Sequence, residues 1–245
     1  MLTESRMDFK GVVFDFDNTL VDTKTTINEA YEKVFSEIAE KFNVDKAKLI
    51  SEANRFQEEK MKELAQSKSS YNHADWIPLI AEGASIKLNE KEKEHYKQIF
   101  YSHVLNNQKF SDKTEGLLKE LKREGKKLAL LSERDSVEGL KAERINKVPF
   151  RGYFDVVVIA GETVPFTKSK DGIKPFVETA KLLGFGTNDI VMIGDRLDLD
   201  IQNAKESGMK TVLFTGYAKS QEKGKYEPDL VISDISEFGR LLRKK

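Results

Sequence analysis

Short apolar runs alternate with amphipathic stretches along most of this chain, and this alternation constrains its fold more than any other feature. The runs have the length of buried strands, and the stretches between them are long enough for helices. The apolar runs are residues 12–14, 128–131, 156–159, 190–193, 211–214 and 230–232, and the amphipathic stretches are residues 114–124, 136–145, 175–183 and 198–207. Strands that alternate with helices predict a parallel sheet covered on both faces. We therefore expect an α/β core, a Rossmann-like doubly wound parallel sheet.

Residues 23–107 interrupt this alternation, because every pattern in them is helical. Apolar residues recur at helical spacing in 26–42, and further helices are expected at 45–65, 76–82 and 89–105. The segment 67–73 has the composition of a loop. The sequence thus predicts an all-helical domain, residues 23–107, inserted into a core domain made of residues 1–22 and 108–245.

Composition excludes several classes of protein. Lys and Arg together number 41, as do Asp and Glu, so no net field attracts nucleic acid or a membrane surface. The absence of cysteine excludes disulfides, thiolate metal sites and cysteine nucleophiles. The polar N-terminus has no signal-peptide pattern, and no apolar run approaches the roughly 20 residues of a membrane span. We expect a cytoplasmic protein; its oligomeric state is not indicated by the sequence.

Polar side chains fall at the ends of several predicted strands. Asp15 and Asp17 follow the first strand, Ser132 the second, and Asp195 the run 190–193. Ligands of open α/β sheets bind beyond the carboxyl ends of the strands. If the first strand continues, Asp15 and Asp17 point to the same side of the backbone. Two carboxylates held so close disfavour each other's ionisation unless a cation or a proton lies between them, which indicates a metal, a proton-transfer role, or both.

Four of these segments resemble the four motifs of the haloacid dehalogenase-like (HAD) hydrolase superfamily. They are DFDNTLVD at residues 15–22, the strand-end Ser132, a lysine ahead of a helix, and GDRLDLD at residues 194–200. The resemblance covers about residues 9–22 and 113–232 in the family's order. It implies that the helical insertion is the family's cap domain. Most members of the family are Mg²⁺-dependent phosphatases.

The resemblance also implies a role for each matching residue. Asp15 would be the nucleophile that forms an aspartyl-phosphate, and Asp17 the general acid and base. The ligands of Mg²⁺ would be the carboxylates of Asp15 and Asp195 and the main-chain carbonyl of Asp17. Ser132 and a lysine would hold the phosphoryl oxygens, and Asp200 would orient the metal's waters or the lysine. The implied substrate is a small phosphorylated metabolite.

Three lysines compete for the third motif in TKSKDGIKPF, residues 167–176. Lys170 has the family's spacing when counted back from the predicted helix end at residues 183–184. Lys168 fits better when counted forward from the strand, and Lys174 forms the lysine-proline pair with Pro175. We expect Lys170, with Lys168 and Lys174 as alternatives.

Two residues depart from the family's pattern. Asn18 stands where glycine is commonest, a mild change because asparagine also tolerates unusual backbone angles. Glu133 follows Ser132 where the family prefers a small or amide residue, and it adds negative charge near the expected phosphate.

Other functions are less consistent with the residues. A calcium-binding EF-hand loop starting at Asp15 fails, because Leu20 occupies the glycine position and Thr26 the final ligand position. A dehalogenase of the same fold would not need Asp17. A phosphotransferase or phosphomutase, or a catalytically weak HAD-like binding protein, stays open. The identity of the phosphomonoester is not indicated, and Arg55, Tyr71, His73 and Trp76 are candidates for contacting it.

Overall fold

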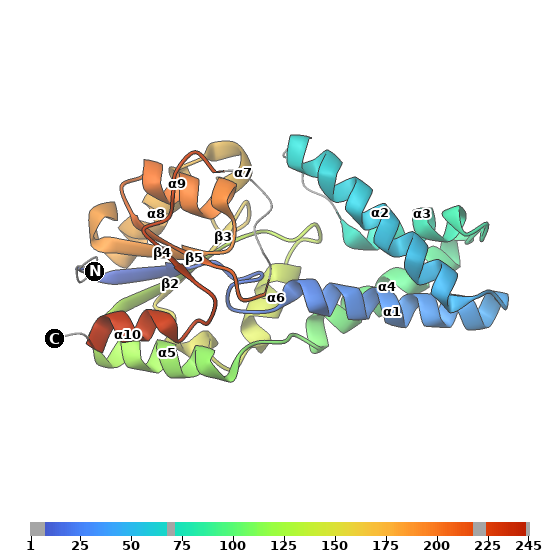
Figure 1. Ribbon diagram of the computed structural model, residues 1–245, viewed down its shortest axis with the longest axis horizontal. Coiled ribbons are helices and arrows are strands. Elements are labelled where there is room, and N and C mark those ends of the chain that lie inside the picture. Colours follow the sequence, from blue (N-terminus) through green and yellow to red (C-terminus); the bar gives the residue numbers. More distant parts are fainter. Residues whose placement is uncertain (1–7, 68–71, 218–223, 244–245) are drawn as a thin grey trace. The chain divides into compact units, whose positions relative to one another are not determined.

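The computed structural model describes residues 8–67, 72–217 and 224–243. The chain divides into two compact units, whose elements are labelled in Figure 1. The core unit comprises the described parts of Met1–Asp22, Phe110–Arg134 and Lys141–Lys245. The helical unit comprises the described parts of Thr23–Lys109 together with Asp135–Leu140.

The core unit contains a six-stranded parallel sheet with strand order β3-β2-β1-β4-β5-β6. The strands are β1 (Gly11–Phe14), β2 (Lys127–Glu133), β3 (Val156–Ala160), β4 (Ile190–Gly194), β5 (Lys210–Phe214) and β6 (Leu230–Ile232). All six coincide with the predicted apolar runs. Parallel strands need crossover connections, and the alternation of strands and helices along the chain supplies them. The predicted doubly wound α/β fold is therefore confirmed.

Helices cover both faces of the sheet. Successive side chains of a buried strand point to opposite faces, so both faces are apolar and need to be covered. Val12 and Phe14 of β1 belong to one apolar cluster, and Val13 belongs to the other. The first cluster includes residues of α5 (Asp112–Arg123), α6 (Leu140–Lys147) and α10 (Glu237–Arg243). The second includes residues of α8 (Lys174–Leu183) and α9 (Gln202–Glu206). Figure 1 shows α5 and α10 on one side of the sheet and α8 and α9 on the other.

The predicted helix at residues 136–145 is shorter in the structure, since α6 begins only at Leu140. Gly139 has φ +78°, which a right-handed helix does not allow. Residues 135–139 therefore lie outside the helix, and Asp135–Leu140 groups with the helical unit. Gly125, Gly184 and Gly208 each follow a helix with positive φ, the left-handed conformation in which helices commonly end.

The helical unit has its own apolar core, formed by one face of each of its helices. Its helices are α1 (Thr23–Phe42), α2 (Lys46–Ser67), α3 (Trp76–Gly83) and α4 (Glu90–Asn106). Asn89 begins α4 with a capping box: its side chain accepts the Glu92 N–H at 3.0 Å, and Glu92 accepts the Asn89 N–H at 2.8 Å. Part of the predicted loop at 67–73 lies outside the described residues, and a short 3₁₀ turn, His73–Asp75, precedes α3.

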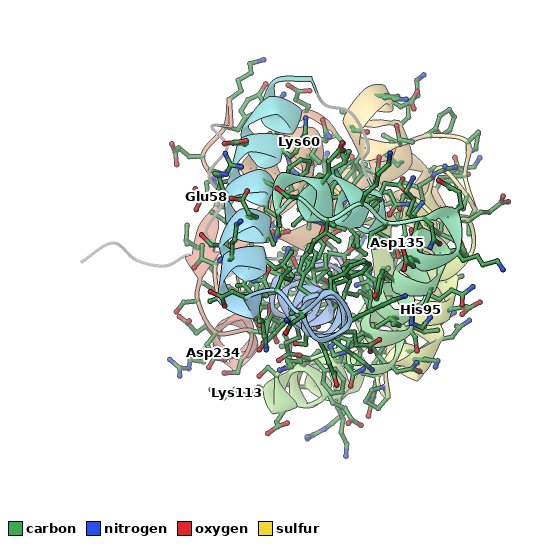
Figure 2. The ribbon with its side chains drawn as sticks, turned by 90° about the vertical axis from the view of Figure 1, so that its right-hand side faces the viewer. Glu58, Lys60, His95, Lys113, Asp135 and Asp234 are labelled. Atoms are coloured by element: carbon green, nitrogen blue, oxygen red, sulfur yellow. The ribbon has the colours of Figure 1, made fainter. Side chains whose placement is uncertain are left out.

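Surface ion pairs connect neighbouring elements of the core unit. Lys113 of α5 pairs with Asp234, which lies just after β6, and the two residues are labelled side by side in Figure 2. The hydrogen bond from Lys113 lowers the pKa of Asp234 to about 2.

None of the helices in the described parts of the chain is both long and apolar enough to span a bilayer.

Candidate active site

The strand order brings the predicted site residues to one edge of the sheet. β1 lies between β2 and β4, with Phe14 paired to Leu130 and to Ile193. Asp15 follows β1 directly and is held there by a hydrogen bond from its N–H to the Ile193 carbonyl, 2.9 Å. Ser132 lies in β2, and Asp195 follows β4. Strand order also reverses beside β1, and such switch points are where open α/β sheets bind ligands.

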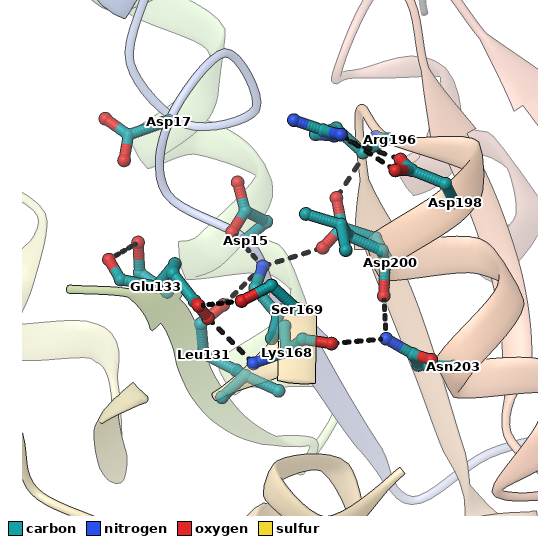
Figure 3. A network of polar contacts seen from close by, with 12 residues as sticks. Asp15, Asp17, Leu131, Glu133, Lys168, Ser169, Arg196, Asp198, Asp200 and Asn203 are labelled. Atoms are coloured by element: carbon teal, nitrogen blue, oxygen red, sulfur yellow. Dashed lines mark hydrogen bonds and ion pairs between the residues drawn. The ribbon is translucent and has the colours of Figure 1, made fainter. Parts of the chain in front are cut away.

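Three buried carboxylates converge at this edge. One carboxylate oxygen each from Asp15, Asp195 and Asp200 lies within 4.8 Å of the others, and none of the three residues is more than 8% exposed. The buried ammonium of Lys168 donates to Asp15 Oδ1 at 2.6 Å and to Asp200 Oδ1 at 2.7 Å (Figure 3). The second oxygen of Asp200 accepts the Arg196 N–H at 3.1 Å.

The electrostatics of this cluster favour a divalent cation. Burial raises the pKa of Asp15 to about 7 despite the opposing charge of Lys168, and Asp200 adds to the rise. Burial likewise raises the pKa of Asp195, with further contributions from Asp200 and Asp15. Burial alone would lower the pKa of Lys168, but the two carboxylates outweigh it and raise that pKa. The cluster thus has more buried acids than the single ammonium of Lys168 can balance. Hard carboxylate oxygens are the ligands that Mg²⁺ prefers, so this donor set fits the ion.

Asp17 lies outside this cluster and has its own cations. Its carboxylate pairs with Lys141 and, at 2.7 Å, with Arg144, both on α6. These two side chains are only 1% and 3% exposed, and both lie over the ring of Phe16. Because β1 ends at Phe14, the alternation that would align Asp15 with Asp17 does not apply. The two acids therefore contact different cations, and Figure 3 shows Asp17 apart from the cluster around Lys168.

The lysine in the cluster is Lys168, and the choice of Lys170 does not match the geometry. Lys170 is exposed, and Lys174 pairs with Asp171 at the surface, 3.4 Å apart. Counting back from the helix end took over the family's spacing between the lysine and the predicted helix at residues 175–183. Gly172, with φ +59°, instead separates a single turn, α7 (Lys168–Asp171), from α8. This turn and its break lie between Lys168 and α8, so the spacing counted from the far end of α8 does not lead to the lysine of the cluster.

The turn after β1 is compact and explains the asparagine at its centre. The N–H groups of Leu20 and Val21 both donate to the Phe16 carbonyl, at 3.0 and 3.1 Å. Asn18 has φ +53°, the left-handed conformation for which asparagine was expected to substitute for glycine.

Ser132 is buried, and its hydroxyl lies 3.3 Å from the Glu133 carbonyl.

Sequence reasoning missed Lys141 and Arg144. They stand three residues apart and so share one face of a helix. The available signal in the sequence was this pair of cations on a helix face that should be buried. A surface helix commonly carries such pairs, and the contact with Asp17 joins residues more than a hundred positions apart.

The four candidate substrate contacts of the helical unit have different surroundings. Trp76 is buried in that unit's apolar core, and Arg55 pairs with Glu52 at 2.5 Å. His73 packs against Trp76 and faces the Tyr31 hydroxyl, 3.3 Å from its Nδ1. Tyr71 lies outside the described residues. Trp76 thus has a packing role within the helical unit.

Gly194 leaves the space that Asp200 occupies, which gives a first testable consequence. A methyl group at position 194 would lie 2.5 Å from three atoms of the Asp200 side chain. We expect Gly194→Ala to displace Asp200 from Lys168 and to weaken metal binding and any catalysis by about tenfold or more. Titration of Mg²⁺ by calorimetry measures the effect. Gly186→Ala is the matched control, because nothing lies within 4 Å of its added methyl; equal affinities in the two variants would contradict the assigned role of Asp200.

A family model described as haloacid dehalogenase-like hydrolase matches residues 12–214, which is most of the chain. The chain belongs to this family. The HAD resemblance of its motifs is thereby confirmed. The sheet edge with Asp15, Asp195 and Lys168 lies within the matched residues.

Relatives that match this HAD protein over nearly their whole length are named as phosphatases. It is 28% identical over 240 residues to N-acylneuraminate-9-phosphatase of Mus musculus, covering 96% of this chain and 94% of the relative. It is 29% identical over 238 residues to phosphoglycolate phosphatase of Aquifex aeolicus, covering 94% and 95%. A putative HAD-hydrolase from Bacillus subtilis shares the fold, with a TM-score of 0.73 at 14% identity over 97% of this chain and 100% of that one. The protein is thus a hydrolase that acts on phosphoric monoesters.

Proposed function

We propose that this protein is a Mg²⁺-dependent phosphatase that hydrolyses a small phosphomonoester through an aspartyl-phosphate on Asp15. The observation that carries the proposal is the buried cluster in which Lys168 contacts Asp15 and Asp200, with Asp195 beside them. A structural ion pair needs one acid for one ammonium, whereas a divalent cation that binds among these carboxylates offsets the additional negative charge.

In the first half of the reaction, a carboxylate oxygen of Asp15 attacks phosphorus. The bond from phosphorus to the ester oxygen breaks as the new bond forms, and Asp17 delivers a proton to the departing alkoxide. Lys168 and Ser132 hold the non-bridging oxygens, whose charge distribution changes during transfer. The alcohol leaves, and the phosphoryl group stays on Asp15.

In the second half, water attacks the phosphorus of the aspartyl-phosphate. Asp17, now ionised, takes a proton from that water, and the Asp15 carboxylate is released with inorganic phosphate. Lys141 and Arg144 fix the side of the site from which Asp17 acts, since both contact its carboxylate.

Asp15, Asp195 and the main-chain carbonyl of Asp17 would hold Mg²⁺, with Asp200 and Lys168 beside them. When bound, the ion neutralises the repulsion between these acids and the phosphate dianion. The Asp15 carboxylate can then stay ionised in a buried place, as a nucleophile must.

Binding of Mg²⁺ is expected to weaken as the pH falls below about 7. Burial raises the pKa of Asp15 to about 7, so below that pH a proton occupies the carboxylate and competes with the metal. One displaced proton corresponds to a fall in affinity of about tenfold per pH unit. Calorimetry in two buffers of different ionisation enthalpy measures both affinity and proton release. The same affinity at about pH 6 and about pH 8, without proton release, would contradict this linkage.

We infer that the helical unit acts as a cap that selects the substrate. Its main segment, Thr23–Lys109, leaves the core unit directly after the turn that contains Asp17, and Asp135–Leu140 follows β2 soon after Ser132. Both connections therefore begin near proposed catalytic residues, where a lid would be hinged. A covered site favours small phosphorylated metabolites over phosphoproteins.

The test of the proposed function is release of inorganic phosphate from a panel of small phosphomonoesters, with Mg²⁺ or with chelator. The panel includes sugar phosphates, phosphoglycolate, acyl-sugar phosphates and nucleoside monophosphates. We expect turnover of at least one ester that disappears with chelator and returns with Mg²⁺. Turnover that persists unchanged in chelator would exclude the proposed metal dependence.

A further inference from the structure

The proposed catalytic Lys168 stands on a helical turn too short to hold its own shape. α7 spans Lys168–Asp171 and ends at Gly172, whose φ of +59° stops the helix. A single turn fixes several residues for few hydrogen bonds, so it is unstable in isolation. Thr167 and Asp171 cap this turn locally, and contacts of Lys168 with the rest of the core unit fix the direction of its ammonium further.

Glu133 supplies two of these contacts. One of its carboxylate oxygens accepts the Lys168 N–H at 2.8 Å, and the other accepts the Ser169 hydroxyl at 2.9 Å (Figure 3). Glu133 is the last residue of β2 and pairs with Ala160 of β3, so its own backbone is fixed by the sheet. The carboxylate thus connects a rigid strand end to the first residue of α7.

Asn203 of α9 holds the same residue from the other side. Its side-chain N–H₂ donates to the Lys168 carbonyl at 3.0 Å and to the Leu199 carbonyl at 2.8 Å. The peptide groups on both sides of the Lys168 Cα are therefore anchored by tertiary contacts. The Glu133 anchor comes from the strand that also carries Ser132, and the Leu131 carbonyl of the same strand accepts from the Lys168 ammonium at 3.5 Å.

We propose that Glu133 is a positioning residue for Lys168, a role that rests on the proposed phosphatase function. By fixing the backbone of Lys168, Glu133 directs the ammonium toward Asp15 and Asp200, where the phosphoryl group is transferred. It also couples the two groups proposed to hold the phosphoryl oxygens, Ser132 and Lys168. The acid that departs from the family's motif thereby has a function.

Simple electrostatics predicts the opposite effect of removing Glu133. A carboxylate near the phosphate site repels a dianionic substrate, so its loss should lower KM and leave kcat unchanged or higher. If Glu133 positions Lys168, its loss should instead lower kcat, because an ammonium displaced by about 1 Å no longer matches the transition state. The direction of the change distinguishes the two roles.

The experiment compares Glu133→Ala and Glu133→Gln with the wild-type protein. Glutamine lacks the charge but keeps an oxygen that can accept the Lys168 N–H. We expect Glu133→Ala to lower kcat by ten- to a hundredfold with a smaller change in KM, and Glu133→Gln to restore kcat to within about threefold of wild type. Affinity for Mg²⁺ stays unchanged in both variants.

Asp155→Ala is the matched structural control. The Asp155 carboxylate also accepts a strand N–H, that of Leu128 at 2.7 Å, and it pairs with Lys122. Leu128 lies near the start of β2, at the opposite end of the strand from Glu133. We expect this variant to lose thermal stability comparably to Glu133→Ala while kcat stays at the wild-type value. A similar fall in kcat in both variants would reduce Glu133 to a general structural role and overturn the proposal.

A second readout does not depend on catalysis. Hydrogen exchange at the Lys168 N–H should be at least tenfold faster in Glu133→Ala than in wild type or Asp155→Ala. An unchanged exchange rate, or a kcat that rises in Glu133→Ala, would overturn the positioning role. If wild type hydrolyses no ester, the proposed function fails, and the exchange measurement still decides whether Glu133 holds Lys168.

Discussion

Replacing Asp15 by asparagine is expected to abolish phosphate release, lowering kcat by about 10⁴-fold or more. The amide keeps the shape of the side chain and an oxygen that can accept from Lys168, but it removes the nucleophilic carboxylate. Assay of the variant on the best ester of the panel measures the loss. Asp189→Asn is the matched control, because that carboxylate pairs only with Lys10 at the surface, 3.1 Å away, among the contacts described. A variant with more than about a tenth of wild-type activity would contradict the nucleophile assignment.

The same substitution should stabilise the metal-free protein at pH values above about 7. The folded-state pKa of Asp15 is raised to about 7 from an ordinary value of 3.8, so the folded protein binds the proton more tightly than the unfolded chain. Ionisation in the folded state therefore costs stability, and this cost develops as the pH rises from about 4 through about 7. Thermal unfolding in chelator should give a higher Tm for Asp15→Asn than for wild type at about pH 8, with the difference vanishing near about pH 4. A lower Tm in the variant at the higher pH would contradict this assignment.

Replacing Lys168 by methionine is expected to lower kcat by about 10² to 10⁴-fold, whereas Lys170→Met should change it by less than about threefold. Lys168 is buried with its ammonium on two acids of the cluster, and Lys170 is exposed on the same turn. Steady-state kinetics of the two variants provides the comparison, and the pair controls for the loss of one positive charge. Circular dichroism verifies that Lys168→Met is folded. Loss of activity in Lys170→Met with an active Lys168→Met would restore the assignment made from helix spacing.

The fold was predictable because it depends on periodicity. A short apolar run that is buried throughout, such as residues 190–193, is typical of a parallel sheet covered on both faces, and each helical stretch has one apolar face. Positive-φ positions followed from residue type, as Asn18 and Gly184 illustrate. These features are local, so a single sequence contains them.

The acidic residues of the site were predictable for a related reason. Asp15, Asp195 and Asp200 lie at strand ends or one helical turn beyond, and parallel strands bring their carboxyl ends to one edge. Strand pairing alone therefore brings together residues that are nearly two hundred positions apart.

The cations of the site were harder to predict because their geometry depends on breaks in the helices and on tertiary contacts. Counting forward from the strand favoured Lys168 and counting back from the helix end favoured Lys170, and the break at Gly172 affects only the second count. Likewise Lys141 and Arg144 look like ordinary residues of a surface helix until α6 packs beside the turn that carries Asp17. Lysine is frequent in this chain, so residue type provided little discrimination.

The central claim is that phosphate is transferred to Asp15 before water releases it. The most direct measurement is chemical trapping: the protein is mixed with its best ester and Mg²⁺, quenched in acid within milliseconds and treated with borohydride, which reduces an acyl phosphate to an alcohol. We predict that Asp15, and no other acid, is recovered as homoserine by peptide mass spectrometry, with none formed without substrate. Single-turnover release of phosphate that leaves Asp15 unreduced at every quench time, or homoserine at another aspartate, would contradict the account.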